Sequence, residues 1–205
     1  MLEARDSIVH LTNLCIRFIR YMRRRKFDRL VLPGDVSRRN ALVRQIERFD
    51  ARLNTLLASD IVAARDREAA KVLQIQSIIS AIWMRRSTVP EECENDKSLP
   101  EFETAVKLAE SIVANAGTRG QRQDLKSSTF LFDMEIVSPV YFIGVKCRHP
   151  QLRRRAMNVL SSTYRREGLW DSDMAAAIVR RVMEIEETNL ATLNGSELPA
   201  EHDRV

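Results

Sequence analysis

The chain has 205 residues, of which 44% are hydrophobic and 30% are charged, and its net charge is +5. This composition is too apolar for a disordered chain, and the small number of glycines and prolines favours helix over strand, so we expect an all-α protein built as an irregular multi-helix bundle of antiparallel helix pairs. Every run of 18 residues contains charged residues, so we expect no membrane-spanning helix. The three cysteines lie far apart in the sequence, so we expect no disulfide and a reducing compartment.

Residues 1–32 are predicted to form a basic amphipathic N-terminal helix. Its apolar stripe consists of Ile8, Leu11, Cys15, Phe18 and Met22. A basic patch lies mainly on the other side and consists of Arg17, Arg20, Arg23, Arg24, Arg25 and Lys26. Such a patch is a candidate nuclear-import signal or anion site, and the alternative is a solvated helix end whose arginines contact the last carbonyls. Without interleaved aromatic residues, any nucleic-acid contact would be with phosphates and would not depend on base sequence.

The second and third helices are predicted from breaks and apolar spacing. Pro33 and Gly34 should interrupt the first helix, and Asp35 or Ser37 should cap the second. The apolar seam of the second helix consists of Leu42, Ile46, Phe49, Leu53 and Leu56. The third helix should begin near Asp60 and occupy the centre of the core, with a stripe that consists of Val72, Ile75, Ile79 and Ile82.

A polar, acidic connection at 87–99 is predicted to be a loop between two helical groups, and its carboxylates lack the spacing and glycine of a calcium site. Ser98 and Glu101 form a capping-box pattern that should start a fourth helix, and Gly117 should end it. Residues 117–129 are expected to form a mobile link, and 130–147 a buried helix pair.

Two more helices are predicted near the C-terminus. Pro150 should open the first and Gly168 should end it, and Asp171 should cap the second. The core-facing stripe of this last helix is expected to consist of Met174, Ile178, Val182 and Ile185. Residues 33–190 are therefore expected to form one helical domain, followed by a disordered tail at 191–205.

The familiar enzyme and metal patterns are absent from the sequence. There is no Cys-x-x-Cys pair, glycine-rich phosphate loop, Gly-x-Ser-x-Gly elbow or His-Glu-x-x-His helix. His10 and Cys15 are about one and a half helical turns apart, so we interpret both as structural. We expect no catalytic residue, no metal and no cofactor.

One segment, Ser138 to Asp171, resembles the C-terminal signature of fungal zinc-cluster transcription factors. The residues that carry the resemblance are Tyr141, Lys146, Cys147, Arg148, Pro150, Arg165, Arg166, Glu167, Gly168, Trp170 and Asp171. Further matches, including Ile82-Trp83 and the stretch after Phe102, extend the resemblance over roughly residues 40–187. Where aspartate is usual before the proline this chain has His149, which should weaken a helix cap by about 1 kcal/mol.

This resemblance implies an all-helical regulatory region that works in the nucleus, after a DNA-binding cluster of six cysteines and two zinc ions. Three scattered cysteines cannot build that cluster, so we expect no sequence-specific DNA binding by this chain alone. The expected function is a regulatory or protein-interaction module of a fungal transcription regulator, nuclear or otherwise cytoplasmic, with a protein partner or self-association and room for a small-molecule effector. The alternative is a stand-alone small-molecule-binding protein or enzyme on the same scaffold.

A second basic cluster runs from Lys146 to Arg166, so both clusters could attract anionic partners. The same arginines have a competing role, because Glu184, Glu186 and Glu187 lie near a helix carboxyl end, where negative charge is unfavourable. We therefore expect arginines from 153–155 or 165–166 to approach these glutamates.

Overall fold

The computed structural model is all-α, as expected, and divides into two compact units, Met1–Pro90 and Glu91–Val205. The residues that it describes are 2–24, 31–59, 62–89, 92–119, 136–162, 166–167 and 170–187. The predicted mobile link lies largely outside these ranges, and the predicted tail lies wholly outside them. Among the described helices, none is both long enough and apolar enough to cross a membrane.

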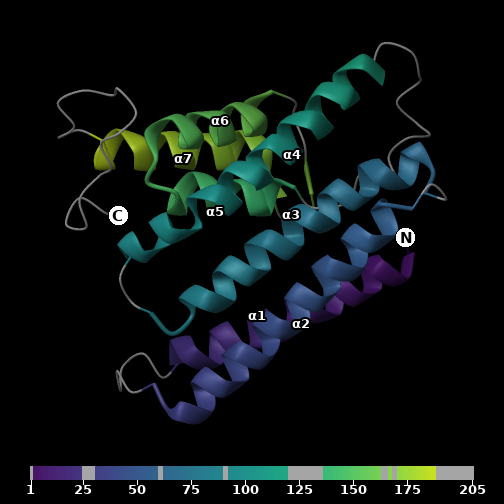
Figure 1. Cartoon of the computed structure of the whole chain (residues 1–205). Helices are drawn as coiled ribbons and strands as arrows, with labels where there is room; N and C mark the ends of the chain where they lie inside the picture. The colour runs from purple at the N-terminus through teal and green to yellow at the C-terminus, as the bar shows by residue number, and fades with distance from the viewer. Residues whose placement is uncertain are drawn as a thin grey trace. The chain divides into compact units, whose positions relative to one another are not determined.

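The first unit is a bundle of three long helices, α1 (Leu2–Arg24), α2 (Pro33–Leu57) and α3 (Ala64–Arg86) (Figure 1). Each helix packs against the other two. The expected division at residue 32 therefore falls inside this unit, because α1 contributes its apolar stripe to the same core as α2 and α3.

The core of the first unit confirms the predicted apolar stripe of α1. All five stripe residues are buried, and three of them form a cluster with residues of α2 and α3. The cluster consists of Cys15, Phe18, Met22, Leu42, Ile46, Ala81 and Met84. Most residues of α3 from Ala70 to Met84 are buried, which agrees with its predicted central place.

The start of α2 differs from the prediction. Pro33 is the first residue of α2 rather than a break before it, which is possible because the first turn needs no backbone N–H donor from proline. Asp35 lies inside the first turn, where its carboxylate accepts a hydrogen bond from the Leu32 backbone N at 3.0 Å. At the other end of α2, Leu56 was expected in the core but is 42% exposed.

The second unit contains a 3-10 helix, four α-helices and one short hairpin among the described residues. They are η2 (Glu92–Ser98), α4 (Leu99–Arg119), α5 (Val137–Lys146), α6 (Pro150–Ser161), β1 (Arg166–Glu167), β2 (Trp170–Asp171) and α7 (Ser172–Glu186). Helices α5, α6 and α7 pack against one another, and α4 packs against α6 and α5 (Figure 1).

Three boundaries in this unit correct the sequence predictions. Part of the predicted acidic loop is the 3-10 helix η2, and α4 continues past Gly117 to Arg119. Helix α6 ends at Ser161, well before Gly168, because residues 166–167 pair with residues 170–171 in an antiparallel hairpin. Gly168 itself lies outside the described residues.

The register of α7 also differs from the prediction. Of the four residues expected in the core, Met174 is 65% exposed, Ile178 is 41% exposed and Ile185 is 42% exposed. The buried face instead consists of Ser172, Ala175, Ala176, Val179, Met183 and Glu186. Helix α7 has two apolar stripes, and the one rich in small residues faces α5, where a side chain on Gly144 would collide with Val179.

Candidate interaction surface

The aromatic residues of the signature join α5 to the hairpin. The rings of Tyr141 and Trp170 lie 5.2 Å apart between centroids, in the tilted arrangement that aromatic pairs prefer. Tyr141 is half-buried on α5, and Trp170 lies in β2. These two residues therefore hold the hairpin against α5.

Two carboxylates of the signature cap helices. The Glu167 side chain is buried, and its Oε2 accepts a hydrogen bond from the Val137 backbone N at 2.9 Å, which satisfies a donor at the start of α5. Asp171 Oδ1 accepts a hydrogen bond from the Met174 backbone N at 3.0 Å, so the predicted cap of α7 is confirmed. Glu167 lies 30 residues after Val137 in the sequence, so no local pattern predicted its contact with the start of α5.

The residues around Pro150 connect η2, α5 and α6. Buried Arg148 donates from Nε to both carboxylate oxygens of Asp96, at 3.1 Å each. Pro150 occupies the first turn of α6, and His149 Nδ1 accepts a hydrogen bond from the Leu152 backbone N at 3.4 Å. This contact is long, as expected for a residue that replaces a stronger cap. Lys146 ends α5 and Cys147 is buried directly after it.

A buried ion network joins α6 to the end of α7. Arg153 is 0% exposed, and its guanidinium lies 2.8 Å from Glu186 and 3.6 Å from Glu187. Its Nε donates to the Gly144 carbonyl oxygen at 3.1 Å. Arg154 lies 2.6 Å from Glu187. The expected approach of these arginines to the acidic end of α7 is therefore confirmed for both.

Arg155 has a different partner from the one expected. It donates to the two carboxylate oxygens of Glu110 on α4, at 2.9 and 2.7 Å, and this contact lowers the pKa of Glu110. Arg181 lies 3.1 Å from Glu184 on the surface of α7. Arg166 is exposed, and Arg165 lies outside the described residues. Arg148 and Arg153 to Arg155 thus pair with carboxylates of their own unit, so they stabilise its fold rather than form a docking site for anions.

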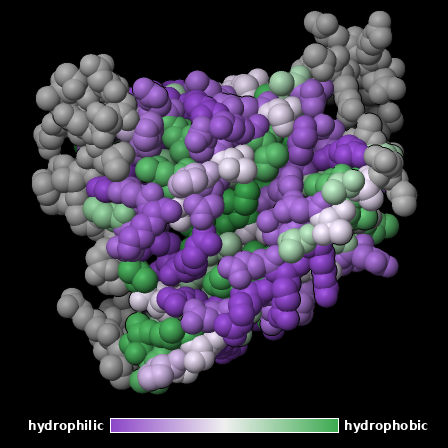
Figure 2. All heavy atoms as spheres, in the orientation of Figure 1, coloured by the Kyte–Doolittle hydropathy of each residue, from purple (hydrophilic) through white to green (hydrophobic). Residues whose placement is uncertain are grey.

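The arginines of the first unit are arranged differently. We define the arginine surface as the exposed arginines of α2 and of the second half of α1: Arg17, Arg20, Arg23, Arg24, Arg38, Arg44, Arg48 and Arg52. Among the described residues, none of these arginines forms an ion pair with a carboxylate. The last two of the predicted patch, Arg25 and Lys26, lie outside the described residues. In Figure 2 the face of α2 that is in view is mainly hydrophilic.

Charge divides unequally between the two units. Residues 1–90 contain 18 Lys and Arg against 9 Asp and Glu, a net charge of +9, whereas residues 91–205 contain 15 against 19, a net charge of −4. Sequence reasoning found the α1 half of the arginine surface but missed the α2 half. The signal for it was the four-residue spacing of Arg44, Arg48 and Arg52, which places all three on the exposed side of α2.

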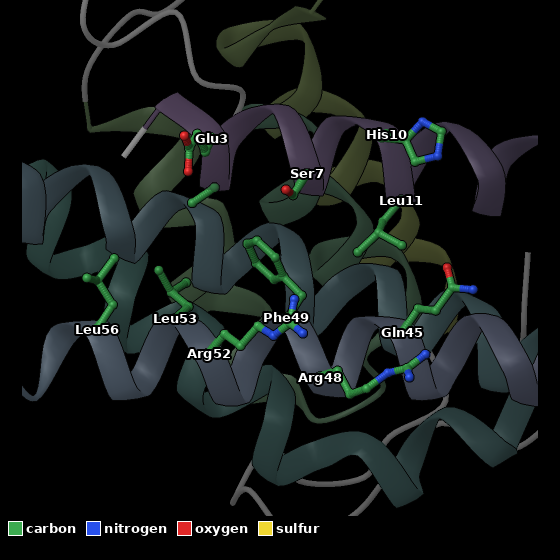
Figure 3. Close-up of a pocket in the computed structure, with 11 residues that line it drawn as sticks. Glu3, Ser7, His10, Leu11, Gln45, Arg48, Phe49, Arg52, Leu53 and Leu56 are labelled. Atoms are coloured by element: carbon green, nitrogen blue, oxygen red, sulfur yellow. The ribbon is translucent and has the colours of Figure 1, made fainter.

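An open groove of about 470 Å³ lies between α1 and α2, and two members of the arginine surface, Arg48 and Arg52, line it. Its apolar part consists of Ala4, Leu11, Phe49, Leu53 and Leu56, and its polar part of Glu3, Ser7, His10, Gln45, Arg48 and Arg52. Figure 3 shows the two helices antiparallel along it, with Glu3 near the Leu53 and Leu56 end and His10 near the Gln45 end.

The candidate thiol and imidazole do not form a nucleophilic pair. Burial raises the pKa of the Cys15 thiol to about 11, which keeps it protonated at neutral pH. His10 is exposed beside the groove, on another side of α1. Within the described ranges, no three His, Cys, Asp or Glu side chains are grouped closely enough to hold a metal ion.

Comparisons of this chain with protein-family models, with curated proteins and with solved structures find no match.

Proposed function

We propose that this chain is a regulatory, protein-interaction module of a fungal transcription regulator, acting in the nucleus without a zinc-cluster DNA-binding domain of its own. The observation that carries this proposal is the arginine surface beside the open groove of α1 and α2. Clustered like charges repel one another and lower the stability of the unit that carries them. We therefore infer that the arginine surface is kept because it binds a partner.

The contrast between the units supports a binding role. In the second unit Arg148, Arg153, Arg154 and Arg155 are all held by carboxylates. The signature residues that resemble the fungal regulatory domain serve there as caps and helix-to-helix contacts. A scaffold in the second unit and an exposed charged face in the first fit a module that binds other macromolecules rather than one that performs chemistry.

A tethering assay tests the role in transcription. The full chain is fused to a heterologous DNA-binding domain in a fungal cell that carries a matching reporter gene, and the DNA-binding domain alone is the control. We expect the fusion to raise or lower transcription of the reporter. Reporter output equal to that of the DNA-binding domain alone, with the fusion present and folded, would overturn the proposed function.

A variant of the same fusion tests the arginine surface. Replacing its eight arginines with serine should return transcription toward the control level, because the charged face is lost while the buried stripes are kept. The matched control is Arg180→Ser, which removes an exposed arginine from α7 in the second unit. If both variants retain the full effect, the arginine surface is not where the partner binds.

The proposed nuclear location has its own measurement. The import signal would be the patch from Arg23 to Lys26, which follows the last buried residue of α1, Met22. Replacing the four basic residues with serine should lower the nuclear fraction of a fluorescent fusion. An unchanged nuclear fraction would show that this patch does not direct import.

A further inference from the structure

We propose that the groove between α1 and α2 binds an acidic amphipathic helix of a partner protein. This inference rests on the proposed function and names the chemistry of the partner. An amphipathic helix in an apolar groove is a common mode of peptide recognition, in which apolar side chains at helical spacing enter the groove and polar side chains stay at its edges.

The shape of the groove fits a helix. Along α2 it extends from Gln45 to Leu56, which is about 16 Å at the usual rise per residue and matches about three turns of a bound helix. The first unit has three helices, so a helix lying along α1 and α2 would complete a four-helix arrangement. Leu56 is 42% exposed and would become buried by such a partner.

The charges along the groove select an acidic partner. Arg48 and Arg52 line the α2 side, and no carboxylate among the described residues neutralises either of them. Arg48 donates from Nε to the Arg44 carbonyl oxygen at 3.2 Å, which fixes the direction of its side chain. Carboxylates on one flank of the bound helix would pair with both arginines, and the net charge of the unit would speed association.

The floor of the groove argues against nucleic acid as the occupant. Phe49 and Leu53 at the floor are already packed in the core, so the apolar surface left for a ligand is mainly Leu56, and a phosphate backbone would use the arginines but leave Leu56 without an apolar partner. Glu3 on the α1 side of the groove would repel phosphates and carboxylates alike, so the acidic flank of a bound helix must face α2, and only a ligand with one uncharged flank can avoid Glu3. An amphipathic helix satisfies both the apolar floor and the arginines.

Binding of a designed peptide to the full chain tests this. The probe is a labelled helix of about 18 residues, long enough to hold helical structure, with leucines on one face and glutamates along one flank. Two control peptides have the same composition in scrambled order, or lysine in place of glutamate. We expect the acidic amphipathic peptide to bind most tightly, as measured by fluorescence anisotropy at two salt concentrations.

Variants of the chain locate the site. Arg48→Glu with Arg52→Glu should weaken binding of the acidic peptide by at least about tenfold and strengthen binding of the lysine peptide. Leu56→Asp should also weaken binding, because it places a charge in the apolar floor. The matched control is Arg180→Glu with Arg181→Glu, which reverses two exposed arginines on α7 in the second unit, outside the residues that line the groove.

Several results would overturn the inference. These are equal binding of the scrambled peptide, an unchanged affinity for Leu56→Asp, or tighter binding of duplex DNA with the same dependence on Arg48 and Arg52. If the peptide does not bind while the tethered chain alters transcription, the groove proposal fails and the proposed function stands. If the peptide binds while the tethered chain leaves transcription unchanged, the groove proposal stands and the proposed role in transcription fails.

Discussion

The close approach of α5 and α7 at Gly144 gives a sharp prediction. A Cβ atom added at this position would lie 2.6 and 2.8 Å from the two methyl groups of Val179, and 3.3 Å from its Cβ. Val179 is fully buried, so it has little room to move away. Gly144→Ala must therefore push α5 and α7 apart, which would also lengthen the hydrogen bond from Arg153 Nε to the Gly144 carbonyl.

Two opposing terms set the size of the effect. Overpacking of a core costs up to about 3 kcal/mol, whereas replacing glycine by alanine inside a helix gains about 1 kcal/mol. We expect Gly144→Ala to lower the free energy of unfolding by about 2 kcal/mol in the native background. In a Val179→Ala background, which itself costs about 2 kcal/mol, the two methyl contacts are removed and only the 3.3 Å contact with the Cβ remains, so Gly144→Ala should instead raise stability by up to about 1 kcal/mol.

Urea unfolding of the four variants gives the coupling between the two positions. Trp170 reports on the second unit, so Trp83→Phe is made in every variant to remove the fluorescence of the first unit. The predicted coupling energy is about 3 kcal/mol, well above the additive limit for independent sites. Equal effects of Gly144→Ala in both backgrounds would refute the close packing of α5 on α7.

Three other tests probe the same unit. Arg153→Met should lower the free energy of unfolding in urea by about 3–5 kcal/mol, because the buried Glu186 carboxylate loses its partner. Adding Glu186→Gln should recover part of that loss, and a decrease below about 1 kcal/mol for Arg153→Met would contradict the network. His149→Asn should raise the free energy of unfolding by up to about 1 kcal/mol, since asparagine is a better cap than an imidazole 3.4 Å away, and a lower stability would count against this cap. Ile178→Asp should change thermal stability little, whereas Val179→Asp should prevent soluble expression or cost several kcal/mol; the opposite order would restore the register predicted from sequence.

Features that depend on neighbouring residues could be predicted from the sequence. The apolar stripe of α1 is buried as its spacing indicated, and Asp171 caps α7 as its position before the helix indicated. The attraction between Arg153 and the acidic end of α7 followed from the unfavourable position of those glutamates. Each of these inferences needs only helical period, cap chemistry or charge at a helix end.

Features that depend on distant residues could not be predicted in this way. Helix α7 has two apolar stripes of similar quality, and the contact of Val179 with Gly144 decided which one is buried. The end of α6 was misplaced because pairing of residues 166–167 with 170–171 was not visible in the local pattern.

The sequence by itself determined that this protein is helical, where its basic residues are concentrated, and most of its helices. Only the tertiary structure decided which arginines are neutralised. Both basic clusters look alike as sequence, but carboxylates from α4, α7 and η2 reach the second cluster, and none among the described residues reaches the arginines of α1 and α2. The physical reason is that an ion pair requires two charges to be brought within about 4 Å, and only the packing of helices far apart in sequence does that.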